Sequence, residues 1–134
     1  MAIVWEEKYS VGVEIIDSQH RQFVSILGRL SKAVEEMKTK EVLDQIVTDL
    51  ENYSEYHFKT EEGYFERFNF DGAKEHIQEH KDFINKLSEI KKSNLSGSLE
   101  MSMELVSFMI DWIVTHISSM DRKYIECFHK NGLK

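Results

Sequence analysis

Apolar residues recur at intervals of three and four along four stretches of the chain, which short polar segments separate. This spacing is typical of amphipathic α-helices, because it places the apolar side chains on one face. It predicts helices over residues 18–38, 40–68, 72–92 and 98–130. Residues 1–16 show no helical periodicity, and their valines and isoleucines predict an extended arm that packs on a core.

Residues at the ends of these stretches predict where the helices begin and end. Asp17 offers an N-cap to the first helix and Thr39 to the second. Residues 69–72, Asn-Phe-Asp-Gly, predict the turn after the second helix, since asparagine and glycine tolerate the left-handed backbone of a helix stop. A polar loop is predicted at 93–98, and the Asn-Gly pair at 131–132 predicts the end of the fourth helix.

Short connections between long helices make sequential neighbours antiparallel. A chain of 134 residues suits one domain, and the absence of proline leaves the helices uninterrupted. Its hydrophobic content of 41% is sufficient for a core at this length. The predicted fold is therefore all-α: one domain, residues 1–134, that forms an up-down-up-down antiparallel four-helix bundle with an extended N-terminal arm.

Composition narrows the classes of partner and compartment. A net charge of −7 argues against a nucleic-acid backbone or an anionic membrane as the main partner. No stretch approaches the ~18 consecutive apolar residues that span a bilayer. Residues 1–8 lack the basic and apolar regions of a secretory signal, and Cys127 is the only cysteine, so no internal disulfide forms. A cytoplasmic location is expected.

The unusual feature of the pattern is a set of polar residues on the apolar faces of the helices. Five histidines and one acid occupy positions that periodicity assigns to the core: His20, His57, Glu61, His76, His80 and His116. A carboxylate buried without a partner is strongly destabilising, and a single core histidine usually needs only a hydrogen-bond partner. Such residues on the inward faces of all four helices need a shared explanation.

A metal centre provides that explanation. Residues i and i+4 lie on one face of a helix, so His57 with Glu61, and His76 with His80, each converge beside their helix. One ion takes about four to six ligands, and five imidazoles with carboxylates suit a pair of ions better. The donor set contains no thiolate, which favours iron, or manganese, over a metal that prefers soft ligands.

The remaining polar and aromatic positions receive simpler interpretations. His129 is interpreted as a surface residue. The aromatic residues of the stripes are interpreted as core: Tyr53, Tyr64, Phe65, Phe68, Phe83 and Trp112. A further set of acids is assigned to solvated helix faces: Glu6, Glu7, Glu35, Glu36, Glu51, Glu55 and Glu62.

The order and spacing of these residues resemble those of the hemerythrins, in particular the single-domain bacteriohemerythrins. The matching segments are His20, then His57-Phe-Lys-Thr-Glu61, His76-Ile-Gln-Glu-His80 and His116-Ile-Ser-Ser-Met-Asp121. The resemblance covers nearly the whole chain, including residues 11–20 and 111–116. It is specific, because it places seven residues of ligand type at family spacings on four predicted helices.

The resemblance implies a centre of two non-haem iron ions with an oxo or hydroxo bridge. The ligands that it implies are His76, His80 and His116 for one iron, His20 and His57 for the other, and Glu61 and Asp121 as bridges between both. The iron with two histidines would keep a vacant coordination position. O2 would bind there end-on.

Asp121 is implied by the resemblance alone, because an ideal α-helix turns it about 140° away from His116. A π-bulge widens a helix and allows two residues five apart to converge. We therefore expect an i to i+5 backbone hydrogen bond near residues 116–121.

Apolar residues one helical turn from the histidines are expected to form a wall around the O2 position and to exclude water. They are Phe23, Val24, Trp112 and Ile113. Ordinary core packing would place the same residue types there, and both interpretations hold together.

The leading hypothesis is reversible O2 binding without catalysis, for transport, storage, delivery or sensing, with an unidentified protein as recipient of the O2. The alternative is a di-iron oxidase, peroxidase or nitric oxide-processing enzyme on the same bundle. Ferritin-like di-iron enzymes usually carry two Glu-x-x-His motifs, whereas this chain has only Glu126-Cys-Phe-His129. The histidine-rich set therefore favours O2 binding. A bundle that holds adventitious zinc or no metal explains the pattern less well.

Overall fold

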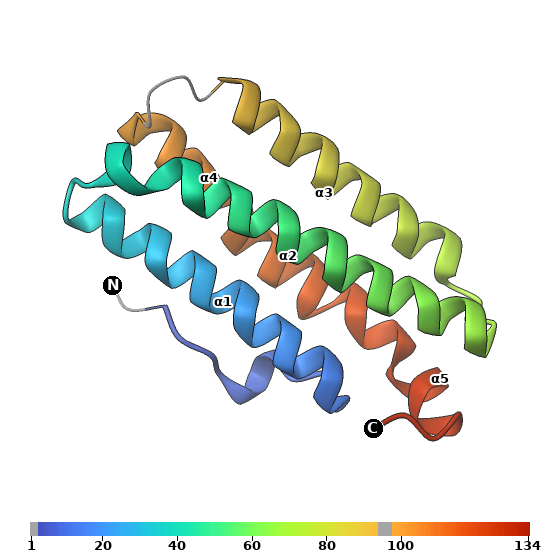
Figure 1. Cartoon of the computed structure of the whole chain (residues 1–134). Helices are drawn as coiled ribbons and strands as arrows, with labels where there is room; N and C mark the ends of the chain where they lie inside the picture. The colour runs from blue at the N-terminus through green and yellow to red at the C-terminus, as the bar shows by residue number, and fades with distance from the viewer. Residues whose placement is uncertain (1–2, 94–97) are drawn as a thin grey trace.

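The computed structural model describes residues 3–93 and 98–134, so residues 94–97 of the predicted polar loop lie outside the described residues. Within the described ranges all regular structure is helical (Figure 1). The α-helices are α1 (Glu14–Glu35), α2 (Thr39–Phe68), α3 (Ala73–Ser93), α4 (Leu99–Trp112) and the short α5 (Ile125–Lys130).

The four long helices lie side by side, and each runs antiparallel to the helix before it (Figure 1). α1 packs against α2 and α4, and α3 packs against α2 and α4, which closes the bundle. The predicted all-α four-helix bundle is therefore confirmed. No helix among residues 3–93 and 98–134 is long and apolar enough to cross a membrane.

The N-terminal arm runs along the outside of α1 and carries one 3-10 turn, Glu7–Tyr9 (Figure 1). Its residues Val11 and Val13 are buried in a small cluster with Phe65 and Phe128. This packing arises because the arm supplies apolar side chains to the end of the bundle where α5 lies. An arm therefore precedes the bundle, but the predicted bounds of 1–16 extend too far, because residues 14–16 belong to α1.

The start of α1 differs from the prediction, because Asp17 does not cap it. The helix begins one turn earlier, and Val13 takes the N-cap position. Asp17 lies inside the first turn, where its Oδ1 accepts a hydrogen bond from the backbone N–H of Val11 at 2.8 Å. Its other carboxylate oxygen accepts from the Ser10 hydroxyl. Asp17 therefore holds the arm against the helix rather than beginning the helix.

The predicted Thr39 cap is also wrong, whereas the two predicted turns end their helices as expected. Lys38 is the N-cap of α2, and Thr39 is its first residue rather than its cap. Asn69 ends α2 in the left-handed conformation, at φ 53°, as the Asn-Phe-Asp-Gly sequence predicts. Gly132, at φ 86°, follows the end of α5. His129 lies partly exposed at the surface, where its Nε2 bonds the Gly12 carbonyl oxygen at 2.7 Å and ties α5 to the arm.

The predicted continuous helix at 98–130 is wrong, because the backbone leaves the α conformation after Trp112. A π-helical segment, Ile113–Ile117, follows α4, and a 3-10 segment, Met120–Tyr124, leads into α5. The Ser118 N–H bonds the Ile113 carbonyl at 2.9 Å, which is an i to i+5 bond. The helix therefore widens first and tightens afterwards.

Candidate metal centre

Seven buried polar side chains meet in the interior of the bundle. Each exposes at most 2% of its surface: His20, His57, Glu61, His76, His80, His116 and Asp121. They come from α1, α2, α3, the π segment and the 3-10 segment. All seven residues that the sequence suggests as ligands are therefore brought together.

In the part of the chain that the structure describes, these residues form two clusters with the geometry of metal sites. The first, called the five-residue cluster, contains Glu61, His76, His80, His116 and Asp121. The second, called the four-residue cluster, contains His20, His57, Glu61 and Asp121. Within each, the ligand atoms lie within 4.8 Å of one another. Glu61 and Asp121 belong to both clusters, so they lie between the two positions that cations would take.

Asp121 faces both clusters with different oxygen atoms. Its Oδ1 lies 2.7 Å from the Nε2 of His76 and 2.9 Å from the Nε2 of His116. Its Oδ2 lies 3.1 Å from the Nε2 of His20. A carboxylate that presents one oxygen to each cluster is arranged to bridge two cations.

Glu61 stands between the clusters with one oxygen. Its Oε1 lies 3.1 Å from the Nε2 of His80 and 3.3 Å from the Nε2 of His57. The buried Tyr124 hydroxyl donates to Oε2 at 2.6 Å and fixes the plane of the carboxylate. Tyr124 is a contact that the sequence analysis missed.

The Nε2 atoms of His20 and His57 lie within hydrogen-bond distance, 3.1 Å apart, but most of the short contacts in the centre are not hydrogen bonds. Several buried ligand atoms lack a hydrogen-bond partner among the described residues: Nε2 of His76, His80 and His116, Oε1 of Glu61, and both carboxylate oxygens of Asp121. Buried polar atoms are almost always satisfied, because an unpaired one loses its hydration without compensation. Nitrogen and oxygen atoms that converge with lone pairs toward one another are satisfied by cations between them. The residues therefore fit a pair of metal ions.

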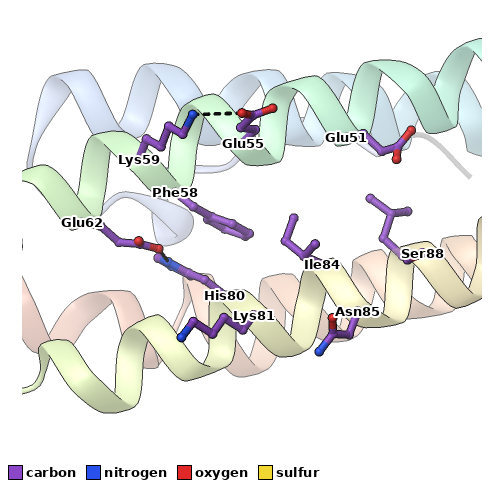
Figure 2. A pocket seen from close by; sticks show the side chains of 11 residues that line it. Glu51, Glu55, Phe58, Lys59, Glu62, His80, Lys81, Ile84, Asn85 and Ser88 are labelled. Atoms are coloured by element: carbon purple, nitrogen blue, oxygen red, sulfur yellow. Dashed lines mark hydrogen bonds and ion pairs between the residues drawn. The ribbon is translucent and has the colours of Figure 1, made fainter.

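Polar side chains contact three of the imidazoles at Nδ1, the ring nitrogen opposite the one that faces the centre. The Nδ1 of His57 lies 2.6 Å from Oε1 of Gln19, and the Nδ1 of His80 lies 2.8 Å from Oε2 of Glu62. Figure 2 shows the Glu62 carboxylate pointing toward the edge of the His80 ring. An acceptor at Nδ1 places the proton on that nitrogen and leaves Nε2 unprotonated, which is the state that binds a metal.

The third imidazole, His116, is held in the same way by Glu79, whose Oε1 lies 2.9 Å from Nδ1. The assignment of Glu62 to a solvated face is corrected, since its side chain is 33% exposed and engaged with His80. A sequence clue to these partners exists: Gln19 and Glu79 directly precede a clustered histidine, and Glu62 directly follows Glu61.

The groove beside His80 brings solvent to the edge of the centre. It lies between α2 and α3, has a volume of about 490 Å³, and is lined in part by Phe58, Glu62 and His80 (Figure 2). The Phe58 ring stacks on the His80 ring at 3.9 Å and separates it from much of the groove. The imidazole itself stays buried, while its carboxylate partner reaches the surface.

Electrostatics keep the acids of the metal-free centre ionised. Burial raises the pKa of Asp121, but the facing His116, His20 and His76 lower it more, so the net pKa lies well below its usual value. Burial and Asp121 likewise raise the pKa of Glu61, and His57 and His80 lower it further than that, so its net pKa also falls. Both acids are therefore in the state that binds a metal.

The pKa of His80 moves in the opposite direction. Burial lowers it, but the Glu61 and Glu62 carboxylates in contact with the ring raise the pKa to about 9. In the absence of a cation the imidazole therefore takes up a proton and balances the acids around it. A bound metal would replace that proton.

The π-helical distortion expected near residues 116–121 is present but lies earlier. The i to i+5 bond joins Ile113 to Ser118, and the following Ser119 N–H bonds the His116 carbonyl at 3.3 Å. The segment from His116 to Asp121 is thus a wide turn followed by a tight one. The π segment before residue 118 and the 3-10 segment after residue 119 together bring Asp121 to the same centre as His116. No single π-bulge spans residues 116–121.

The four apolar residues expected to wall an O2 position lie on different sides of the centre. Trp112 stacks on His116 at 3.8 Å, against the five-residue cluster. Phe23 contacts Tyr53 at 5.8 Å, and Tyr53 stacks on His57 of the four-residue cluster. Val24 and Ile113 are buried in the main core cluster. Their role as a wall stays a prediction.

Comparison with known proteins places this geometry in a family. Residues 11–128 match the Hemerythrin HHE cation binding domain. The bacteriohemerythrin of Clostridium acetobutylicum is 28% identical over 130 residues, which cover 92% of this chain and 98% of that protein. The bacteriohemerythrin of Stenotrophomonas maltophilia is 26% identical over 124 residues, which cover 92% of this chain and 80% of that protein. The myohemerythrin of Riftia pachyptila is 27% identical over 121 residues, which cover 90% and 89%. Because the matched range contains every residue of both clusters, the chain belongs to the hemerythrin family.

Proposed function

We propose that this protein binds O2 reversibly at a pair of non-haem iron ions, without turning over a substrate. One observation carries the proposal: the two clusters share two carboxylates but differ in size, with five ligand residues against four. Two ions held in this way would be bridged but unequally coordinated. The ion in the four-residue cluster would have one protein ligand fewer and room for a small molecule.

The choice of metal follows from the donor atoms. The clusters offer imidazole and carboxylate and no thiolate, since Cys127 lies outside them, 3.9 Å from the Phe68 carbonyl oxygen. This set suits iron or manganese, and the family supports iron. When bound, two ferrous ions would supply both the electrons and the open coordination position that reversible O2 binding needs.

The residues of this chain would perform three tasks around the metals. Glu61 and Asp121 would neutralise cationic charge and fix the distance between the ions. Gln19, Glu62 and Glu79 orient the imidazoles through Nδ1. Rings packed on the imidazoles, such as Trp112 on His116 and Phe58 on His80, would keep water away from the centre.

An enzymatic role is the competing proposal, because a di-iron bundle also suits oxidation chemistry. The relatives described above carry the names bacteriohemerythrin and myohemerythrin, which supports binding rather than catalysis at the level of the family. Transport, storage, delivery to a partner protein and sensing all remain uses of the same binding step.

The proposal is tested by an iron count and a spectrum. We expect about two iron ions per purified chain, and visible charge-transfer bands that appear when the reduced protein meets air and fade when O2 is removed. Sustained O2 consumption with release of peroxide would instead support an oxidase. Purified protein that holds zinc, or no metal after reconstitution with ferrous iron, would contradict both.

Glu61 provides the sharpest single substitution, because it contributes to both clusters. Glu61→Ala should reduce the iron content well below one ion per chain, while the far-ultraviolet circular dichroism of the helices stays unchanged. Glu66→Ala, at an exposed position of the same helix, is the matched control and should retain the iron. Normal iron content in Glu61→Ala would show that the carboxylate does not bridge.

A further inference from the structure

Tyr53 is a buried tyrosine whose hydroxyl has no hydrogen-bond partner among the residues that the structure describes. The residue is 8% exposed, and its hydroxyl oxygen is fully buried. Tyrosine hydroxyls inside proteins usually find a partner, because burial without one is destabilising. The place of Tyr53 on the apolar stripe of α2 explains the burial of the ring but not that of the hydroxyl.

The position of Tyr53 associates it with the four-residue cluster. It precedes His57 by one turn of α2, and the two rings stack with centroids 5.3 Å apart and planes inclined by 15°. Phe23 of α1 packs against the same tyrosine ring. Tyr53 therefore adjoins the cluster that offers one protein ligand fewer, and Phe23 packs behind it.

The hydroxyl is also within electrostatic reach of the carboxylates of the centre. Burial raises its pKa well above the usual value, and the charges of Glu61 and Asp121 raise it further. A tyrosine hydroxyl carries one proton to donate, and no described residue accepts it here, so it is available to an acceptor with a lone pair. Tyr124 provides a contrast, because its hydroxyl is occupied by Glu61 at 2.6 Å.

We propose that the Tyr53 hydroxyl donates a hydrogen bond to the small ligand, O2 or a small anion, that completes the four-residue cluster. The inference rests on the proposed function and adds a polar contact to a pocket otherwise expected to be apolar. Such a donor favours ligands that carry negative charge on a terminal atom, so the Tyr53 hydroxyl determines ligand specificity while the ring belongs to the core.

The test compares Tyr53→Phe with the wild-type protein, using azide on the oxidised, iron-loaded form. Phenylalanine keeps the stacked ring and removes only the hydroxyl. Because a hydrogen bond to a charged group is lost, the azide dissociation constant should rise about tenfold or more. The antisymmetric stretch of bound azide should shift on transfer to D2O in the wild type and stay fixed in the variant.

A structural role of the hydroxyl is separated by two further measurements. Tyr56→Phe, three residues along α2 at a 60% exposed position, should bind azide like the wild type. The metal-free Tyr53→Phe protein should melt at the wild-type temperature or above it, because no protein hydrogen bond is lost.

The outcomes distinguish this inference from the function on which it rests. Iron-loaded Tyr53→Phe with unchanged azide affinity and unchanged infrared shift would overturn the role of Tyr53 and leave the di-iron function intact. A wild-type protein that takes up no iron would overturn both.

Discussion

The groups that accept a hydrogen bond from Nδ1 of the imidazoles differ in charge between the four-residue and the five-residue cluster. His57 is held by the neutral amide of Gln19, whereas His80 and His116 are held by the carboxylates of Glu62 and Glu79. A carboxylate at Nδ1 makes an imidazole a stronger donor to a metal than an amide does. His80 and His116 of the five-residue cluster are thus more basic than His57, and this cluster should hold its ion more tightly.

Glu79 allows this difference to be measured, because it contacts His116 without belonging to either cluster. Glu79→Ala should weaken metal binding by about 10-fold to 100-fold, since the imidazole loses its orientation and its preferred tautomer. The measurement is a competition titration with a chelator of known affinity. Glu75→Ala, exposed one turn earlier on α3, is the control. Equal affinities in the two variants would show that the Glu79 contact has no influence on the metal.

Single residues differed in how far the sequence could predict them. His20 and His116 stood out because an imidazole on an apolar stripe is costly unless it has a partner. Gln19 and Glu79 did not stand out, because a polar residue next to a helix stripe is ordinary and its partner lies on another helix. Tyr53 and Tyr124 were hidden for a related reason: a tyrosine at a core position reveals its ring but not the direction of its hydroxyl.

The hydrogen bonds from Nδ1 of the imidazoles also link each helix of the bundle to the next one along the chain. Gln19 of α1 reaches a histidine of α2, Glu62 of α2 reaches one of α3, and Glu79 of α3 reaches His116 in the π segment. Each helix therefore supplies a buried or half-buried acceptor to the helix that follows. These contacts fix the rotation and the height of neighbouring helices, which apolar packing alone specifies less strictly.

The π segment is the element on which the site depends most. In a regular α-helix His116 and Asp121 would face directions about 140° apart. The segment Ile113–Ile117 contains one residue more than an α turn, and the 3-10 segment after it tightens the chain. Periodicity predicted one helix over 98–130 because the apolar stripe continues through the region, and the widening was expected only because the resemblance made both His116 and Asp121 ligands.

Deletion of Val114 tests the dependence on this segment. Val114 is 62% exposed, so its removal costs little core packing. The shorter segment should close into a regular α-helix, which cannot point both His116 and Asp121 at the centre, and the protein should hold fewer than two metal ions. Val114→Ala keeps the length and should keep both ions. Full metal content in the deletion variant would show that the surplus residue is dispensable.

At the scale of the whole molecule, the centre joins parts of the bundle that apolar packing leaves separate. On one side of the centre lies the main core cluster, whose Phe58 and Tyr53 pack against His57. On the other side lies the smaller cluster with the arm residues Val11 and Val13, whose Phe65 and Tyr124 pack against His76. Between them, the layer of seven polar residues contains two buried acids. A fold divided in this way relies on charge neutralisation in its middle layer.

Metal removal should therefore destabilise the protein as a whole. A ligand that binds only the folded state at a free concentration about 1,000 times its dissociation constant adds about 4 kcal/mol to the free energy of unfolding. In a chain of this size that corresponds to a fall of about 15 °C in melting temperature when the metal is removed. Calorimetry of the iron-loaded and chelator-treated protein measures the difference, and Glu61→Ala, which should hold little metal, should melt at one temperature under both conditions. Identical melting of the loaded and metal-free wild type would mean that protons on residues such as His80 balance the buried acids as well as cations do.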